Sequence, residues 1–213
     1  MNINGVDATK ALIDFVRIYS PSRHEQKAGK YLVKLMQELG FNSHIDEGGN
    51  AVCFPRHMKD ASEAEILLFG HMDTVPPELD VREENGILYG RGAVDAKSPL
   101  LALLFGAAKA SPKYKYAIVA CVEEEIESAK GAKHMLTYLK PKMAILGEPS
   151  GTNGITISYR GRIVFEIISK SAHMHAGMQS ETAIEKTFSF YQKLKADFAS
   201  KKEFYACPQE NLY

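Results

Sequence analysis

Short apolar runs alternate with longer amphipathic segments along most of the chain. The runs at 66–70, 116–122 and 142–146 are apolar without alternation, which is typical of strands covered on both faces of a sheet. Four other segments have apolar residues at helical spacing. The first begins after Asp7, and the others lie at 25–39, 97–110 and 128–139. This order predicts an α/β fold with a mostly parallel mixed sheet and helices on both faces.

Turn residues mark the ends of these elements. Asp7 is a suitable N-cap, Ser20-Pro21-Ser22 ends the first helix, and Gly40 follows the second helix as a C′ residue. Glycine and asparagine also mark two tight turns. They predict two hairpins, one joining 41–45 to 51–54 through 47–50, the other joining 81–83 to 87–89 through Asn85-Gly86.

The pattern changes after Pro149. Strands with alternating faces are expected at 155–158 and 163–169, followed by a long amphipathic helix at 181–200. A boundary near 159–162 would separate a unit at 1–160 from a second unit at 161–213. The second unit has too few elements to close a core of its own, so it is expected to be incomplete or to pack on another chain.

Composition excludes some classes of protein. Lys plus Arg and Asp plus Glu both number 26, so the net charge of zero gives no reason to expect a nucleic acid or an anionic membrane as partner. No apolar run approaches a membrane span, and the first residues show neither the basic nor the apolar stretch typical of a secretory signal, so none is expected. The three cysteines are scattered without pairing motifs, which favours a reducing compartment, and we expect a cytoplasmic protein.

The candidate chemistry lies where the predicted strands end. His71 and Asp73 follow the strand at 66–70, the triplet at 123–125 follows the strand at 116–122, and Glu148 follows the strand at 142–146. Asp95 lies between a glycine-rich turn and a helix. Because the carboxyl ends of parallel strands meet at one edge, these side chains are expected to lie together. An imidazole with several carboxylates predicts a site for a divalent metal ion.

Each of these residues also has an ordinary structural explanation. His71 could be hydrogen-bonded to a turn aspartate, Asp95 could cap the helix that follows it, and the triplet could be a solvated charge run. Four strand-to-loop junctions with such groups favour a metal site instead. Adjacent carboxylates after a buried strand repel each other unless a cation neutralises them. One aspartate can bridge two ions about 3.5–4 Å apart, and a neighbouring carboxylate can then act as general base.

Four motifs together resemble one enzyme family. Gly-His-Met-Asp-Thr-Val-Pro at 70–76, Gly-Arg-Gly-Ala-Val-Asp-Ala-Lys at 90–97, Glu-Glu-Glu with Lys-Gly-Ala at 130–132, and Gly-Glu-Pro-Ser at 147–150 are similar to the co-catalytic zinc amidohydrolases and metallopeptidases. That family includes acetylornithine deacetylase, succinyl-diaminopimelate desuccinylase and aminoacylase. The motifs look most like those of the hydrolases that release lysine or ornithine from a small acidic amino-group carrier protein in lysine and arginine biosynthesis.

The resemblance implies a zinc exopeptidase-like catalytic domain with a role for each matching residue. It implies two divalent metal ions, zinc or alternatively cobalt, with Glu124 as general base and Asp73 orienting His71. The metal ligands it implies are His71, Asp95 as the bridge, Glu125 and Glu148. The triplet leaves the register open, because Glu123 and Glu124 could take these two roles instead; an acidic residue usually precedes the pair in the family, which favours Glu124 and Glu125.

The resemblance also assigns 161–213 to part of a lid and dimerisation domain, and it implies a homodimer. The lid of the family carries a histidine that stabilises the oxyanion in a partner subunit's site. His175 is favoured over His173 for this role. The last metal ligand of the family is a histidine beyond the lid, and no histidine follows His175 here. An inactive metal-binding or dimerising fragment therefore stays open as an alternative. A deacylase or dipeptidase of small N-acyl amino acids is a second alternative, because the motifs are less specific for the member than for the family.

Overall fold

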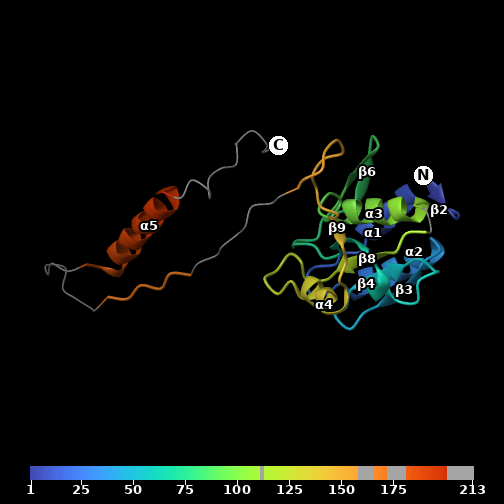
Figure 1. Ribbon diagram of the computed structural model, residues 1–213. Coiled ribbons are helices and arrows are strands. Elements are labelled where there is room, and N and C mark those ends of the chain that lie inside the picture. The colour runs from blue at the N-terminus through green and yellow to red at the C-terminus, as the bar shows by residue number, and fades with distance from the viewer. Residues whose placement is uncertain (111–112, 158–165, 172–180, 201–213) are drawn as a thin grey trace. The chain divides into compact units, whose positions relative to one another are not determined.

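The computed structural model describes residues 1–110, 113–157, 166–171 and 181–200. The chain divides into two compact units, Met1–Ile155 and Thr156–Tyr213 (Figure 1). The predicted boundary near 159–162 lies outside the described residues. The assignment of the second unit to a lid and dimerisation domain stays a prediction.

The helices of the first unit begin and end close to where the sequence predicts them. Asp7 accepts a hydrogen bond from the Lys10 amide at 2.8 Å, so it caps the first helix as expected. Gly40 follows the second helix with a φ of 100°. The helices are α1 (Ala8–Val16), α2 (Gln26–Glu38), α3 (Lys97–Lys109) and α4 (Lys130–Tyr138), with a short 3-10 turn at Ala61–Glu63.

A five-stranded sheet forms the centre of this unit, in the order β3-β4-β8-β5-β9. β5 is parallel to both β8 and β9, whereas β4 is antiparallel to β3 and β8. Four of the five strands therefore point the same way, which confirms the mixed, mostly parallel sheet. The strands are β3 (Asn42–Ile45), β4 (Ala51–Phe54), β5 (Ile66–His71), β8 (Tyr116–Cys121) and β9 (Met143–Leu146).

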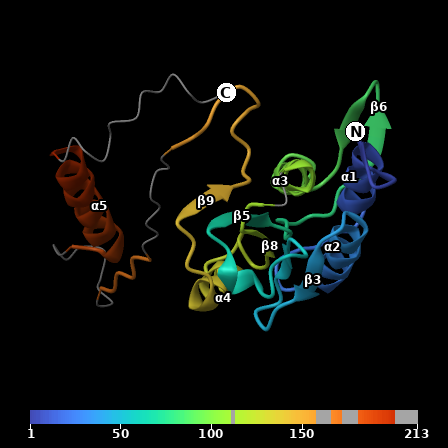
Figure 2. The same ribbon diagram turned by 45° about the vertical axis from the view of Figure 1, so that its right-hand side comes forward.

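β8 explains why an apolar run without alternation indicates a covered sheet. All six of its residues are buried. Ile118 and Ala120 face a core shared with α1, α2 and α3, whereas Ala117 and Val119 face a second core shared with α4. Figure 2 shows α3 and α4 on opposite faces of the sheet. Each face of the central strand thus has its own apolar layer.

The shorter elements also follow local sequence signals. β1 (Asn2–Ile3) pairs with β2 (Val6–Asp7), and β6 (Arg82–Glu84) pairs with β7 (Ile87–Tyr89). Asn85 and Gly86 both have positive φ, as the second hairpin requires. In the second unit α5 (Ala183–Ser200) is helical, but residues 155–157 and 166–171 form no strand, so the strands predicted there are wrong in their described parts. No helix among the described residues is long and apolar enough to cross a membrane.

Two glycine substitutions test the packing of α4 on the sheet. A Cβ at Gly131 would lie 2.6 Å from the Val122 nitrogen and would also clash with the side-chain oxygen of Asn50, whereas a Cβ at Gly106 of α3 would meet nothing within 4 Å. We expect Gly131→Ala to lower the free energy of unfolding by about 1–3 kcal/mol through overpacking. Gly106→Ala should raise it by about 0.5–1 kcal/mol, because alanine is the better helix former.

Urea unfolding monitored by circular dichroism measures both changes. Equal stability of the two variants would show that α4 does not pack against β8 through Gly131.

Candidate metal centre

The register of the parallel strands places the predicted residues at one rim of the sheet. His71, the last residue of β5, pairs with Cys121, the last residue of β8, and Phe69 pairs with Leu146, the last residue of β9. The glutamate triplet and Glu148 therefore leave the sheet on either side of His71. Asp95 reaches the same place from the loop before α3, where its carboxylate contacts the imidazole.

The imidazole of His71 lies among carboxylates although it is only 1% exposed. Its Nε2 is 3.1 Å from an oxygen of Asp95, 3.7 Å from one of Glu148 and 3.9 Å from one of Glu124. Glu125 joins the same group, because its carboxylate, that of Asp95 and a nitrogen of His71 offer atoms within 4.8 Å of one another. Of the side chains expected at this edge, those of Asp95, Glu124, Glu125 and Glu148 therefore gather around His71. Glu123 does not join them, because its carboxylate accepts a hydrogen bond from the Ser128 hydroxyl.

The other ring nitrogen of His71 is held by the backbone. Nδ1 is 2.9 Å from the carbonyl oxygen of Asp73 and 3.5 Å from its carboxylate. Since a carbonyl oxygen only accepts, this hydrogen bond requires the proton on Nδ1 and leaves the lone pair of a neutral ring on Nε2. Asp73 thus contacts His71 through Nδ1, and its carbonyl oxygen is the closer partner.

The carboxylate of Asp73 is instead bound to the loop after β8. It is 0% exposed, accepts the amide protons of Glu124 and Glu125 at 3.1 Å each, and accepts the Ser22 hydroxyl at 2.7 Å. Burial raises the pKa of Asp73, but the hydrogen bonds from His71, Ser22 and the two amides outweigh it, and the pKa is lowered. Asp73 therefore stays charged and links the end of β5 to the triplet.

Lys97 ties the loop of Asp95 to α1. Its side chain is 0% exposed, and its ammonium donates to the carbonyl oxygens of Phe15 at 3.2 Å and Ile18 at 2.6 Å, at the C-terminal end of α1. These carbonyls carry the negative end of the helix dipole, which suits a cation. Burial lowers the pKa of Lys97 to about 8. Lys97 ends the motif at 90–97, but the sequence predicted no role for it, and it predicted none for Ser22 or Glu25 in the turn before α2.

The crowding of charge shifts the pKa values of the cluster. Burial alone would lower the pKa of His71, but the hydrogen bond to Asp73 and the charges of Glu148, Asp73 and Glu124 raise it to about 9. Burial raises the pKa of Glu148 to about 7, and the negative charges of Asp95 and Glu124 add to the rise although His71 opposes it. Burial likewise raises the pKa of Glu125. These shifts show a site that holds more negative charge than one imidazolium neutralises.

The donor set fits a divalent metal ion. One imidazole nitrogen and several carboxylate oxygens are ligands that zinc and its neighbours in the first transition row accept. Within the described residues, the side chains of Asp95, Glu124 and Glu148 have His71 as their polar partner. His71 and these three carboxylates are therefore available to hold metal, and Glu125 is available as well, because it is grouped with His71 and Asp95. His173 and His175 lie outside the described residues.

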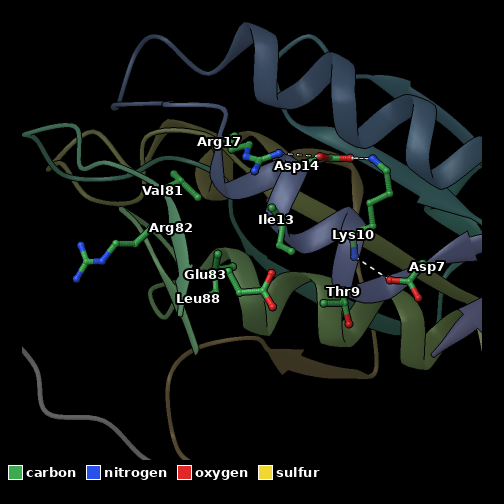
Figure 3. A pocket seen from close by; sticks show the side chains of 10 residues that line it. All are labelled: Asp7, Thr9, Lys10, Ile13, Asp14, Arg17, Val81, Arg82, Glu83 and Leu88. Carbon is green, nitrogen blue, oxygen red and sulfur yellow. Dashed lines mark hydrogen bonds and ion pairs between the residues drawn. The ribbon is translucent and has the colours of Figure 1, made fainter. Parts of the chain in front are cut away.

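A separate surface cavity of about 360 Å³ lies between α1 and the β6–β7 hairpin (Figure 3). None of the predicted site residues lines it. Figure 3 shows Asp14 between Lys10 and Arg17, with which it forms ion pairs. This cavity therefore carries none of the chemistry that the sequence predicts.

Three relatives with assigned names resemble the chain over most of its length. A protein of Pyrococcus abyssi, provisionally named as a LysW-lysine/LysW-ornithine hydrolase, is 38% identical over 192 residues, which cover 89% of this chain and 55% of the relative. The LysW-lysine hydrolase of Deinococcus radiodurans is 32% identical, covering 84% of this chain and 50% of the relative. The LysW-lysine/LysW-ornithine hydrolase of Saccharolobus islandicus is 34% identical, covering 83% and 49%. The chain thus spans about half the length of these relatives.

Solved structures and a family model agree on the fold. A tripeptidase from Staphylococcus aureus matches with a TM-score of 0.51 at 23% identity, and the aminopeptidase PepT from Bacillus cereus matches with 0.52 at 21%. Each match covers 68% of this chain and 43% of the other. The model of peptidase family M20/M25/M40 matches residues 67–207, which include every predicted site residue. By its fold, its rim of histidine and carboxylates, and this match, the chain belongs to peptidase family M20/M25/M40.

Proposed function

We propose that this chain carries most of the metal centre of an amide hydrolase that releases lysine or ornithine from a small acidic amino-group carrier protein. The observation that carries the proposal is the convergence of Asp95, Glu124 and Glu148 within 4 Å of His71 Nε2. The names of the three relatives support the substrate, because each specifies LysW-linked lysine or ornithine. A homodimer, a cytoplasmic location and a role for His175 at the oxyanion belong to the same proposal.

The metal ligands in this proposal are His71, Asp95, Glu125 and Glu148. Asp95 suits the bridging position, because its carboxylate is 3.1 Å from His71 and also belongs to the group of ligand atoms that includes Glu125. When bound, a pair of zinc or cobalt ions would lower the pKa of a water molecule and polarise the amide carbonyl. The four carboxylates of Asp95, Glu124, Glu125 and Glu148 match the charge of two such ions.

Glu124 is the proposed general base. Its side chain is 50% exposed, so water reaches it, and its carboxylate lies 3.9 Å from His71 Nε2. From that position it can take a proton from the attacking water and return it to the leaving amine of lysine or ornithine. The Asp73 carboxylate orients Glu124 by accepting a hydrogen bond from the backbone amide of Glu124, not from its side chain.

Substrate release tests the proposed activity. With zinc or cobalt added, we expect the chain to release lysine or ornithine from the carrier protein faster than it cleaves N-acetyl-lysine, N-acetyl-ornithine or succinyl amino acids. Amino-acid analysis of the products measures all of these rates in parallel. Preference for the free N-acyl amino acids would contradict the carrier substrate, and bound metal without any release would contradict hydrolysis by this chain.

Three glutamine substitutions separate the roles in the triplet region. We expect Glu125→Gln to weaken zinc binding by at least about tenfold, because a ligand charge is lost. Glu124→Gln should leave the zinc affinity within about threefold but slow hydrolysis by about 10²–10⁴-fold, as loss of a general base does. Glu127→Gln, at an exposed position of the same loop, is the matched control and should change neither.

Isothermal titration and the release assay provide the two readouts. The reverse result, with zinc affinity lost in Glu124→Gln and kept in Glu125→Gln, would move both roles one residue toward the N-terminus.

Zinc affinity should rise with pH, because metal competes with protons at the site. His71, with a pKa of about 9, and Glu148, with a pKa of about 7, both carry protons in the metal-free protein under mildly acidic conditions. Binding should therefore release close to two protons at about pH 6 and close to one at about pH 8. Each released proton makes the affinity rise about tenfold per pH unit.

Calorimetry in buffers of different ionisation enthalpy counts the released protons. An affinity that does not change between about pH 6 and about pH 8 would exclude both groups as ligands.

A further inference from the structure

Glu25 is a buried carboxylate that neither the motifs nor the proposed chemistry uses. It precedes α2 and is only 3% exposed. Although it occupies the N-cap position, its side chain makes no capping hydrogen bond to the helix. Its Oε1 instead accepts two backbone amide protons, from Arg23 at 2.9 Å and from Glu123 at 3.0 Å. A buried charge with this arrangement connects the turn before α2 to the first residue of the triplet.

Both residues bound by Glu25 have a left-handed backbone. Arg23 has a φ of 75° and Glu123 a φ of 55°. Residues other than glycine adopt this conformation when their surroundings hold them there. The side chain of Glu123 is directed away from the cluster, because it accepts a hydrogen bond from the Ser128 hydroxyl at 2.6 Å. The conformation of Glu123 therefore turns the chain, so that the next two residues face His71.

Two buried carboxylates together bind three consecutive amides of this loop. Glu25 holds the N–H of Glu123, and Asp73 holds those of Glu124 and Glu125. Consecutive amide groups that point inward form a natural site for an anion, and the protein fills this site with its own carboxylates. Because the two carboxylates hold the backbone of this loop, the side chains of Glu124 and Glu125 are left to approach the imidazole.

The turn at 20–25 also holds the other half of the site. The Ser20 hydroxyl donates to the Met72 carbonyl at 2.7 Å, the Thr74 amide donates to the Ser20 carbonyl at 3.0 Å, and the Ser22 hydroxyl donates to Asp73. The same turn is thus hydrogen-bonded to the loop after β5 and, through Glu25, to the loop after β8. A displacement of either loop relative to the other would have to break these bonds.

We propose that Glu25 is a positioning residue for the metal centre, which fixes Glu124 and Glu125 by holding the Glu123 amide. The inference rests on the proposed function, because it presumes that these glutamates serve a bound metal ion. Residues that orient metal ligands from behind typically contribute about 10-fold to 100-fold to metal affinity.

Three substitutions separate the reach of the Glu25 side chain from its charge. Glu25→Gln keeps an oxygen acceptor at the same distance but removes the charge. Glu25→Asp keeps the charge but is one methylene shorter and cannot reach the Glu123 amide, and Glu25→Ala loses both. We expect zinc affinity to fall about 10-fold to 100-fold in Glu25→Asp and Glu25→Ala and to stay within about threefold of the wild type in Glu25→Gln. The absorption spectrum of bound cobalt should change in the first two variants only.

Tyr116→Phe is the matched control for a general loss of stability. It removes another buried hydrogen bond, from the Tyr116 hydroxyl to the Ala107 carbonyl at 2.9 Å, at the opposite end of β8 from His71. We expect it to lower the melting temperature without changing zinc affinity or the cobalt spectrum. Glu25→Gln and Glu25→Asp retain most of the side chain, so the comparison stands even where Glu25→Ala does not fold.

The outcomes distinguish this inference from the proposed function. A wild-type chain that binds neither zinc nor cobalt overturns both. A wild-type chain that binds metal while Glu25→Asp binds it equally well, with an unchanged cobalt spectrum, overturns the role of Glu25 alone. If Glu25→Gln bound zinc weakly and Glu25→Asp bound it strongly, the charge of Glu25 rather than the reach of its side chain would support metal binding. That result would also overturn the proposed role of Glu25.

Discussion

Repulsion among carboxylates is the constraint on which this site depends. Asp95, Glu124 and Glu148 each approach His71 Nε2 within 4 Å, and one imidazolium cannot balance them. Against the effect of burial, the hydrogen bond to Asp73 and the nearby carboxylate charges raise the pKa of His71 to about 9. Burial and the same crowding of charge raise the pKa of Glu148 to about 7. With raised pKa values, His71 and Glu148 bind protons more readily, and these protons offset part of the negative charge that a cation would otherwise balance. Bound metal would remove the same repulsion without protonating either group.

The sheet brings these charged groups together. Parallel pairing of β5 with β8 and β9 brings three strand ends to one rim, and the cores on both faces of β8 fix that register. A shift by one residue would turn Ile118 and Val119 to the wrong cores. The hydrophobic layers therefore set the distances between polar groups that are far apart in sequence.

Much of this arrangement follows from local sequence patterns. The apolar runs of β5, β8 and β9 mark their own ends, so the groups at the rim can be predicted from the rule that parallel strands share an edge. The partners of the supporting residues are harder to predict from the sequence. Ser22 is hydrogen-bonded to Asp73, at a separation of 51 positions, and Glu25 to Glu123, at a separation of 98 positions. The periodicity of the sequence does not predict such a contact, because each contact depends on how two loops approach each other in the folded chain.

The residues at 155–157 and 166–171 show that sequence patterns are also limited in predicting strands. Their alternation is typical of strands, but a strand needs a neighbour, and strand propensity depends on that context. Lys97 is a further case, since a lysine at the start of a helix is ordinarily exposed. Its burial depends on the C-terminal carbonyls of α1, which lie about eighty positions earlier in the chain.

The carboxylates around the centre separate into two kinds by what they already bind. Asp73 and Glu25 are buried and accept hydrogen bonds from backbone amides, so the fold itself stabilises their negative charge. The side chain of Asp95 is 60% exposed, that of Glu124 is 50% exposed and that of Glu148 is 18% exposed. Within the described residues, His71 is the only charged partner of these three carboxylates. A metal ion gains most from oxygens whose charge is not yet balanced. This difference favours Asp73 as a support and the outer carboxylates as the groups that meet metal and water, a division that the residue types alone do not reveal.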